Sequence, residues 1–257
     1  MLSKNKIKLI RSLELKKNRT ATALFVAEGK KLVFDLLQSE IGISEVFCTE
    51  TIGRELIRRK SDLNVEIVDK EELSRISFLK TTPEIVALCR MPKSVIDWEE
   101  ILLDMTLVLD TIQDPGNLGT IVRLADWFGI RNIICSEESA DLFNPKVVQS
   151  TMGSIARVKV HYGSLPGFLS RAREMNIPVY GTYLEGDNIY NCDLKGNGLV
   201  VMGNEGNGIS GEIETYISRK INIPSFPTGV KTSESLNVAM AASIICAEFR
   251  RRISGKG

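Results

Sequence analysis

Three polar, glycine-rich loops follow predicted strands in the second half of the chain, and they hold the residues best suited to chemistry. The first loop contains Asn117 and leads to Arg123, the second contains Glu205, and the third contains Ser235 and Asn237. Amide and carboxylate groups can orient a polar substrate, and a guanidinium group can stabilise developing negative charge. A tight turn or a helix N-cap would explain each loop taken singly, so the loops must be weighed together.

Several other site chemistries are disfavoured by what the sequence lacks. His161 is the only histidine, so a multi-histidine metal site cannot form, and a lone histidine is more often a satisfied structural side chain. The five cysteines are scattered without a C-x-x-C pair, which predicts reduced, mostly buried thiols and no metal. Neither a G-x-G-x-x-G pattern nor a phosphate-binding P-loop is present, so neither NAD nor ATP is indicated.

The composition predicts a globular protein with a basic first half. Hydrophobic residues make up 43% and charged residues 25% of the chain, and the formal net charge is +1. Residues 1–95 hold 18 Lys and Arg against 13 Asp and Glu, which suits a module that contacts phosphates, although a solvated helix face explains this equally well. No membrane-spanning run or secretory signal is evident, so we expect a cytoplasmic location without membrane contact.

The first half alternates apolar runs with helical patterns, which predicts an α/β domain over residues 1–95. Strands are expected at 24–28, 44–50, 64–69 and 84–90, with helices between them. Residues 3–18 have the pattern of an amphipathic basic helix. A change in composition at 92–104, which includes Pro92, predicts a linker.

The second half repeats the alternation, which predicts a second α/β domain over residues 104–257 with a mainly parallel sheet. We expect strands at 105–114, 132–137, 158–162, 178–186, 198–203 and 220–225 and helices at 116–129, 144–156, 165–176, 210–217 and 233–252. Ligands usually bind at the carboxyl ends of such parallel strands, which is where the three polar loops lie.

Taken in order, the three loops resemble a known family. The segments DPGNLGTIVRLADWFGI, VMGNEGNGIS and INIPSFPTGVKTSESLNVAMAASI closely resemble the three signature motifs of the SpoU/TrmH family of RNA 2′-O-ribose methyltransferases. Upstream, FVAEGKKLVFDLLQ resembles the start of that family's N-terminal substrate-binding domain. The resemblance covers roughly residues 20–250.

The resemblance implies the fold, the reaction and the partners. It implies a knotted catalytic domain, in which the C-terminal segment threads through a loop to form a deep trefoil knot, and a smaller N-terminal α/β domain like a ribosomal protein. It implies a homodimer that transfers a methyl group from S-adenosyl-L-methionine to a ribose 2′-hydroxyl of RNA. Ribosomal RNA, 23S in particular, is favoured over tRNA because the N-terminal domain resembles those of rRNA-modifying members.

The resemblance also assigns the site residues. Asn117 and Arg123 are expected at the reacting ribose, with Glu205, Ser235 and Asn237 completing the catalytic set. Arg123 either takes the 2′-proton or orients the ribose-phosphate and stabilises the alkoxide, while Glu205 acts directly or holds Asn117 or Arg123 in place. The expected cofactor-binding residues are Thr182, Leu184, Gly203, Asn204, Gly206, Ile223 and Leu236, and the expected RNA-binding residues are Lys16, Lys17, Arg19, Lys30 and Lys31.

Other functions are weighed against this assignment. A non-catalytic RNA-binding relative would be expected to lose catalytic side chains, but all five are present. A methyltransferase acting on an RNA base, such as guanine N1, would need a pocket that extracts the base. A tRNA ribose methyltransferase is a further alternative, and a small-molecule methyltransferase is least favoured because of the basic N-terminal module.

Overall fold

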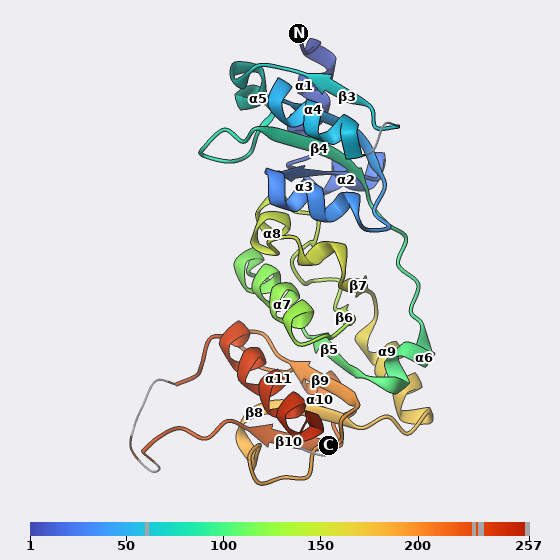
Figure 1. Ribbon diagram of the computed structural model, residues 1–257. Coiled ribbons are helices and arrows are strands. Elements are labelled where there is room, and N and C mark those ends of the chain that lie inside the picture. Colours follow the sequence, from blue (N-terminus) through green and yellow to red (C-terminus); the bar gives the residue numbers. More distant parts are fainter. Residues whose placement is uncertain (60–61, 228–229, 231–233, 255–257) are drawn as a thin grey trace. The chain divides into compact units, whose positions relative to one another are not determined.

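The computed structural model describes residues 1–59, 62–227, 230 and 234–254, and it divides into two compact units (Figure 1). Unit 1 comprises Met1–Lys93 and Asp141–Arg157, and unit 2 comprises Ser94–Ala140 and Val158–Gly257. The chain leaves the first stretch of unit 1 after Lys93, at the start of the linker expected over 92–104. The assignment of Asp141–Arg157 to unit 1 has no counterpart in the sequence prediction.

Unit 1 is built on a mixed four-stranded sheet of order β1-β4-β2-β3. Strand β4 is antiparallel to both of its neighbours, and β2 is parallel to β3. The strands are β1 (Leu24–Glu28), β2 (Ile43–Cys48), β3 (Val65–Ile67) and β4 (Ile85–Arg90). The helices are α1 (Lys4–Ser12), α2 (Lys16–Thr22), α3 (Lys30–Leu37), α4 (Glu50–Arg59), α5 (Lys70–Ile76) and α8 (Pro145–Ser150), followed by the 3₁₀ helix η1 (Ser154–Ala156).

The basic N-terminal segment forms two helices, where the sequence pattern predicts one. Helix α1 ends at Ser12, and α2 begins at Lys16 after Leu13 has turned into the core, where it is fully buried. The Arg19 side chain of α2 folds back and donates to the carbonyl oxygens of Leu13 and Glu14, each at 2.7 Å. These bonds satisfy two carbonyl groups in the turn between α1 and α2.

Unit 2 contains a six-stranded parallel sheet of order β10-β8-β9-β5-β6-β7, which agrees with the predicted mainly parallel sheet. The strands are β5 (Met105–Leu109), β6 (Asn132–Cys135), β7 (Lys159–Tyr162), β8 (Val179–Asn188), β9 (Gly198–Met202) and β10 (Arg219–Asn222). The helices are α6 (Trp98–Leu103), α7 (Pro115–Trp127), α9 (Leu165–Glu174), α10 (Gly211–Glu214) and α11 (Val238–Ser254).

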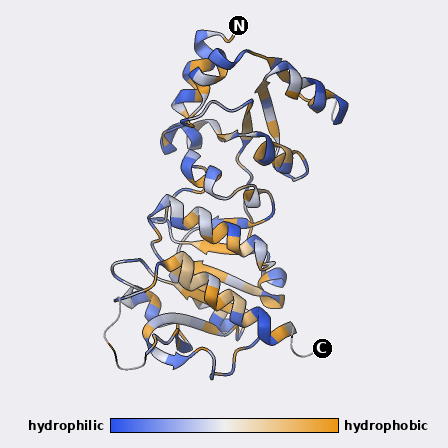
Figure 2. Ribbon diagram, turned by 60° about the vertical axis from the view of Figure 1, so that its left-hand side comes forward, coloured by the Kyte–Doolittle hydropathy of each residue, from blue (hydrophilic) through white to orange (hydrophobic). Residues whose placement is uncertain are grey.

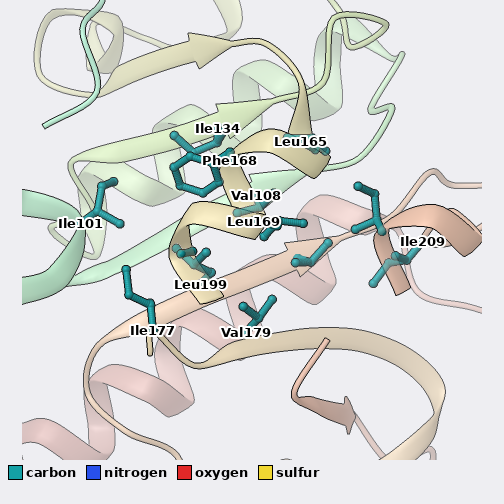
Figure 3. Packing of buried hydrophobic residues seen from close by; sticks show 13 residues of the cluster. Ile101, Val108, Ile134, Leu165, Phe168, Leu169, Ile177, Val179, Leu199 and Ile209 are labelled. Atoms are coloured by element: carbon teal, nitrogen blue, oxygen red, sulfur yellow. The ribbon is translucent and has the colours of Figure 1, made fainter. Parts of the chain in front are cut away.

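Hydrophobic residues concentrate on the strands of this sheet (Figure 2). In the cluster of Figure 3, Phe168 and Leu169 of α9 face Val108 of β5 and Leu199 of β9, and α6 and α10 complete the same layer. Alternate strand residues point to the opposite face, where α7 and α11 pack against each other. The two layers of helices make a rigid support for the loops at the strand ends.

Two further predicted helices differ from those in the structure. The helix expected at 144–156 is interrupted, because Met152 and Gly153 adopt positive φ angles of 52° and 100°, which an α-helix cannot contain. The last helix begins at Val238 and not near residue 233. Asn237 therefore lies before α11 and not one turn into it. Its side chain accepts from the amides of Ala239 and Met240, so it caps the helix.

Candidate active site

The three loops singled out in the sequence lie at the carboxyl-terminal edge of the unit 2 sheet. The first loop, residues 110–114, follows β5; the second loop, residues 203–210, follows β9; and the third loop, residues 223–237, follows β10 and leads into α11. Because all six strands are parallel, their carboxyl ends share one edge. Of the third loop, residues 228–229 and 231–233 lie outside the described residues.

Hydrogen bonds join three side chains into a chain: one side chain from the start of α7, just after the first loop, and one from each of the other two loops. The Asn117 Nδ2 atom donates to Glu205 Oε1 at 2.7 Å, and the Asn237 Nδ2 atom donates to Asn117 Oδ1 at 3.0 Å. Asn117 lies in the first turn of α7, where its backbone amide donates to the N-cap carboxylate of Asp114. Asn117 therefore links Glu205 and Asn237 through the donor and the acceptor of a single amide group.

A cavity of about 870 Å³ opens between the ends of β8, β9 and β10 and the start of α11. It is lined by all seven residues predicted to bind the cofactor and by two of the predicted catalytic residues: Thr182, Leu184, Gly203, Asn204, Gly206, Ile223, Leu236, Glu205 and Ser235. Its volume falls within the roughly 300–1,000 Å³ typical of cofactor sites. The structure thus brings these nine residues to one concave surface.

The second loop turns back tightly on itself at the mouth of this cavity. A Cβ atom at Gly203 would lie 2.2 Å from the carbonyl carbon of Gly208, so only glycine allows this close approach. The Asn204 side chain accepts from the amides of Gly206 and Asn207 at 2.9 and 3.1 Å. Backbone groups of this loop consequently face the cavity in a fixed arrangement.

Arg123 and Ser235 lie outside the hydrogen-bonded chain of Glu205, Asn117 and Asn237. Ser235 lines the cavity, whereas Arg123 is exposed on α7, is absent from the cavity lining and has no hydrogen bond or ion pair among the described residues. Thr120 and Trp127 lie on the same exposed stripe of α7. The guanidinium group of Arg123 is therefore available to a molecule that approaches this face of the helix.

Several polar residues that line the cavity were not predicted from the sequence, and among them Tyr183, Glu214 and Lys220 lie together. The Lys220 ammonium group lies 4.6 Å from the centre of the Tyr183 ring and pairs with Glu214 at 2.5 Å. The Tyr183 hydroxyl is buried and has no hydrogen-bond partner among the described residues. Burial, together with the negative charges of Glu214 and Asp110, raises the pKa of Tyr183 to about 12. Tyr183 is therefore neutral near pH 7 and is not a ready base. Its place between Thr182 and Leu184 is the one signal that could have identified it.

The predicted RNA-binding residues of unit 1 fall into two groups. Lys16, Lys17, Lys30 and Lys31 are exposed, and Lys30 pairs with Glu55 at 2.7 Å. Arg19 is only 2% exposed, and its guanidinium group pairs with Asp141 at 2.5 Å. The prediction that Arg19 contacts RNA is therefore wrong for this structure, because its donors are already used inside the unit.

Two further classes of site have no counterpart in the part of the chain that the structure describes. There, no group of three or more His, Cys, Asp and Glu side chains is arranged to hold a metal ion. Among the same residues, no helix is both long and apolar enough to cross a membrane.

Comparisons with protein families agree with this two-part organisation. Residues 104–247 match the model of the SpoU rRNA methylase family, and residues 4–87 match that of the MRM3-like substrate-binding domain. The chain is 30% identical over 250 residues, or 95% of its length and 96% of the relative's, to the 23S rRNA (guanosine(2553)-2′-O)-methyltransferase RlmP of Bacillus subtilis.

Solved structures are similar over nearly the whole chain. A TrmH-family structure from Porphyromonas gingivalis is 38% identical with a TM-score of 0.88, and the alignment covers 98% of this chain and 99% of that one. An rRNA methyltransferase from Sinorhizobium meliloti, solved with AdoMet bound, is 29% identical with a TM-score of 0.85 over 98% of this chain and 97% of that one.

Proposed function

Because this chain belongs to the SpoU rRNA methylase family, we propose that it transfers a methyl group from S-adenosylmethionine to a ribose 2′-hydroxyl of ribosomal RNA, with 23S rRNA as its substrate. The observation that carries the proposal is the chain of side chains Glu205–Asn117–Asn237, which connects the start of α7 with the second and third loops beside the cavity. The alternatives of tRNA, of an RNA base such as guanine N1 and of a non-catalytic relative become outcomes of the test below.

The cavity suits S-adenosylmethionine in its size, its charge and its backbone groups. Its described charged side chains are four glutamates, Glu185, Glu205, Glu214 and Glu234, and one lysine, Lys220. This excess of negative charge favours a cofactor that carries a sulfonium and an ammonium group. Apolar side chains of Ile223, Leu236 and Ile245 can cover the adenine, while the folded second loop offers amides and carbonyls to its edge. When bound, S-adenosylmethionine supplies a methyl group activated by its positively charged sulfur.

In the proposed reaction, the residues of the chain position the ribose and stabilise charge. Glu205 holds the Asn117 amide in one orientation, so that Asn117 can meet the ribose without having to reorganise. Arg123 contacts the ribose-phosphate through its guanidinium fork and stabilises the developing 2′-alkoxide, and the proton leaves to water or to a phosphate. Ser235 and Asn237 complete the polar side of the site.

The same family membership supports three finer proposals about the assembly. First, the segment after β10 forms a deep trefoil knot. Second, unit 1 has a ribosomal-protein-like fold that binds rRNA. Third, the enzyme is a homodimer in the cytoplasm. The large apolar side chains of Trp127 on α7 and Met240 on α11, 85% and 60% exposed, support a subunit interface on these helices. Sedimentation of Trp127→Asp tests the interface, since the proposal predicts a monomer and an unchanged dimer contradicts it.

The reaction is tested by methyl transfer from labelled S-adenosylmethionine into rRNA, tRNA and ribosomal subunits from a strain that lacks this protein. We expect a 2′-O-methylated nucleoside in 23S rRNA, absent with Arg123→Ala and retained with Arg131→Ala, which removes another exposed arginine of unit 2. Label in tRNA or in a methylated base would replace the substrate proposed here. Cofactor binding without label in any RNA would favour a non-catalytic relative.

The role of Arg123 is tested by its replacement with lysine. A lysine keeps the positive charge but lacks the bidentate fork, so the proposal predicts a large fall in kcat with unchanged affinity for S-adenosylmethionine, because Arg123 does not line the cavity. Near-normal turnover of Arg123→Lys would exclude a requirement for the fork. A change in the pH–rate profile would indicate instead that residue 123 takes the proton.

A further inference from the structure

The Asp110 side chain is a buried carboxylate of unit 2 that lies beneath the second loop. It directly follows β5 and is only 5% exposed. Its Oδ2 atom accepts from the Ser210 amide at 2.7 Å, and its Oδ1 atom accepts from the Thr111 hydroxyl at 3.1 Å. Asp110 does not line the cavity, although its negative charge helps to raise the pKa of Tyr183 there. A buried carboxylate is costly unless it is hydrogen-bonded, and these two bonds offset that cost.

The bonds of Asp110 secure the end of the second loop, and the next residue secures its start. The Asn204 Nδ2 atom donates to the Thr111 carbonyl oxygen at 2.8 Å. Asn204 and Ser210 bound the tight turn that Gly203 makes possible. Consecutive residues after β5 therefore hold both ends of the loop that carries Glu205 and lines the cavity.

The backbone of Thr111, which holds the start of the second loop, adopts an unfavourable conformation. Thr111 has a φ of 60°, in the left-handed region that a β-branched residue rarely adopts. Its amide donates to the Ser136 Oγ atom at 3.0 Å, which fixes the turn from the other side. Strained backbone that is held by several hydrogen bonds is typical of functional sites. In this conformation, the Thr111 carbonyl oxygen accepts from Asn204 and the Thr111 hydroxyl donates to Asp110.

We propose that Asp110 is a positioning residue for the cofactor: together with Thr111 it holds both ends of the second loop, so that the backbone of residues 203–208 is arranged for S-adenosylmethionine before binding. This proposal rests on the proposed function, because it presumes that cofactor. The loop then needs no ordering when the cofactor binds, and Glu205 stays within reach of Asn117. Removal of the Asp110 carboxylate leaves the Ser210 amide without its acceptor and frees one end of the loop.

The test measures affinity for S-adenosylmethionine by calorimetry, without RNA, in wild type, Asp110→Ala and Asp110→Asn. Removal of a hydrogen bond to a charged group predicts that Asp110→Ala binds about 10- to 100-fold more weakly. Asparagine still offers an oxygen to the Ser210 amide, and its NH₂ group can donate to the Thr111 hydroxyl, so Asp110→Asn should remain within about threefold of wild type. In kinetics, Asp110→Ala should raise KM for the cofactor more than it lowers kcat.

A second readout separates positioning of the loop from general stability. Hydrogen exchange of the Ser210 amide should accelerate in Asp110→Ala, while amides of β6 and β7 stay protected. Asp104→Asn is the matched control, because Asp104 precedes the same strand, pairs with Arg250 at 2.7 Å and lies outside the cavity lining. It should bind the cofactor with wild-type affinity.

The outcomes distinguish this proposal from the proposed function. If wild type binds no S-adenosylmethionine, the proposed function itself fails. If wild type binds and Asp110→Ala binds equally well, with the Ser210 amide still protected, the positioning role is overturned. An equal decrease in affinity for Asp110→Asn and Asp110→Ala would also overturn it, because asparagine retains the acceptor for Ser210.

Discussion

The amide group of Asn237 donates to the side-chain oxygen of Asn117 at 3.0 Å, although 120 positions of the sequence separate the two residues. Asn237 also accepts from the first amides of α11. The cap of the last helix is therefore directly bonded to the first turn of α7. Any displacement of one helix start relative to the other changes the orientation of Asn117.

The first prediction concerns Asn117 itself. Asn117→Ala removes both the donor to Glu205 and the acceptor for Asn237, so the polar groups that should meet the ribose are no longer held in a fixed orientation. We expect kcat for methyl transfer to fall by about 10²-fold or more, as for the removal of one oriented donor. Affinity for S-adenosylmethionine should change little, since Asn117 does not line the cavity.

Steady-state kinetics with saturating cofactor provide the measurement. Asn191→Ala serves as the control, because Asn191 is an exposed asparagine of unit 2 outside the cavity. If substitution of Asn117 weakened cofactor binding as much as it slowed turnover, this would contradict separate roles for Asn117 and for the cavity.

The second prediction concerns RNA binding by unit 1. Lys16 and Lys17 are exposed at the start of α2, so replacing both with glutamine should weaken RNA binding and flatten its dependence on salt. The slope of log K against log[salt] should decrease by roughly 0.7–0.9 for each phosphate that the protein no longer neutralises. Filter binding at several salt concentrations measures this, with Lys195→Gln in unit 2 as the control. Unchanged affinity and slope would remove α2 from the RNA-binding surface.

Much of the catalytic unit could be predicted because its signals are local. Continuous apolar runs identify the parallel strands, and parallel strands bring their carboxyl ends to one edge. Asn117 and Glu205 follow β5 and β9, which are neighbours in the sheet, and the structure joins them by a hydrogen bond. The family's motifs identified these positions by residue type alone.

The remainder depends on contacts that no local pattern contains. Arg19 has the sequence context of a surface charge, and its burial depends on Asp141, which lies 122 positions away. The role inferred for Asp110 follows from a bond to Ser210, 100 positions away. The helix expected at 144–156 is interrupted at Met152 and Gly153, and of these two only the glycine is a residue type that signals a positive φ.

The third prediction follows from the buried position of Arg19. Arg19→Ala leaves the Asp141 carboxylate, itself only 14% exposed, without its cation. Breaking a buried pair from one side destabilises by about 3–5 kcal/mol. We expect the β1 amides of unit 1 to exchange much faster, measured by hydrogen–deuterium exchange. Arg54→Ala, which breaks the exposed pair with Glu50, should change stability by less than about 1 kcal/mol. Similar effects of the two substitutions would contradict a structural role for Arg19.

The last prediction concerns the pH dependence of unit 2 and depends on His161. Its Nδ1 atom lies 2.5 Å from the Ser94 hydroxyl and its Nε2 atom 3.0 Å from Asn132 Oδ1. Because the Asn132 Nδ2 atom donates to Glu100, its oxygen accepts, so the neutral ring carries its proton on Nε2. Burial, followed by the charge of Lys159, lowers the pKa of His161 below 6.5, against the opposing effect of Glu100.

In the unfolded chain, His161 takes up a proton near pH 6.5. In the folded protein, it takes up the proton only at a lower pH, because its pKa is lowered. Stability is therefore complete above pH 6.5 and decreases as pH falls below it, by at most about 1.4 kcal/mol per pH unit. Both tryptophans of the chain, Trp98 and Trp127, lie in unit 2, so urea unfolding followed by fluorescence reports on this unit. We expect His161→Gln to be less stable than wild type at pH 8 and to lose less stability between pH 7 and pH 5.5. A parallel decrease in the two proteins over that range would assign the pH dependence to other groups.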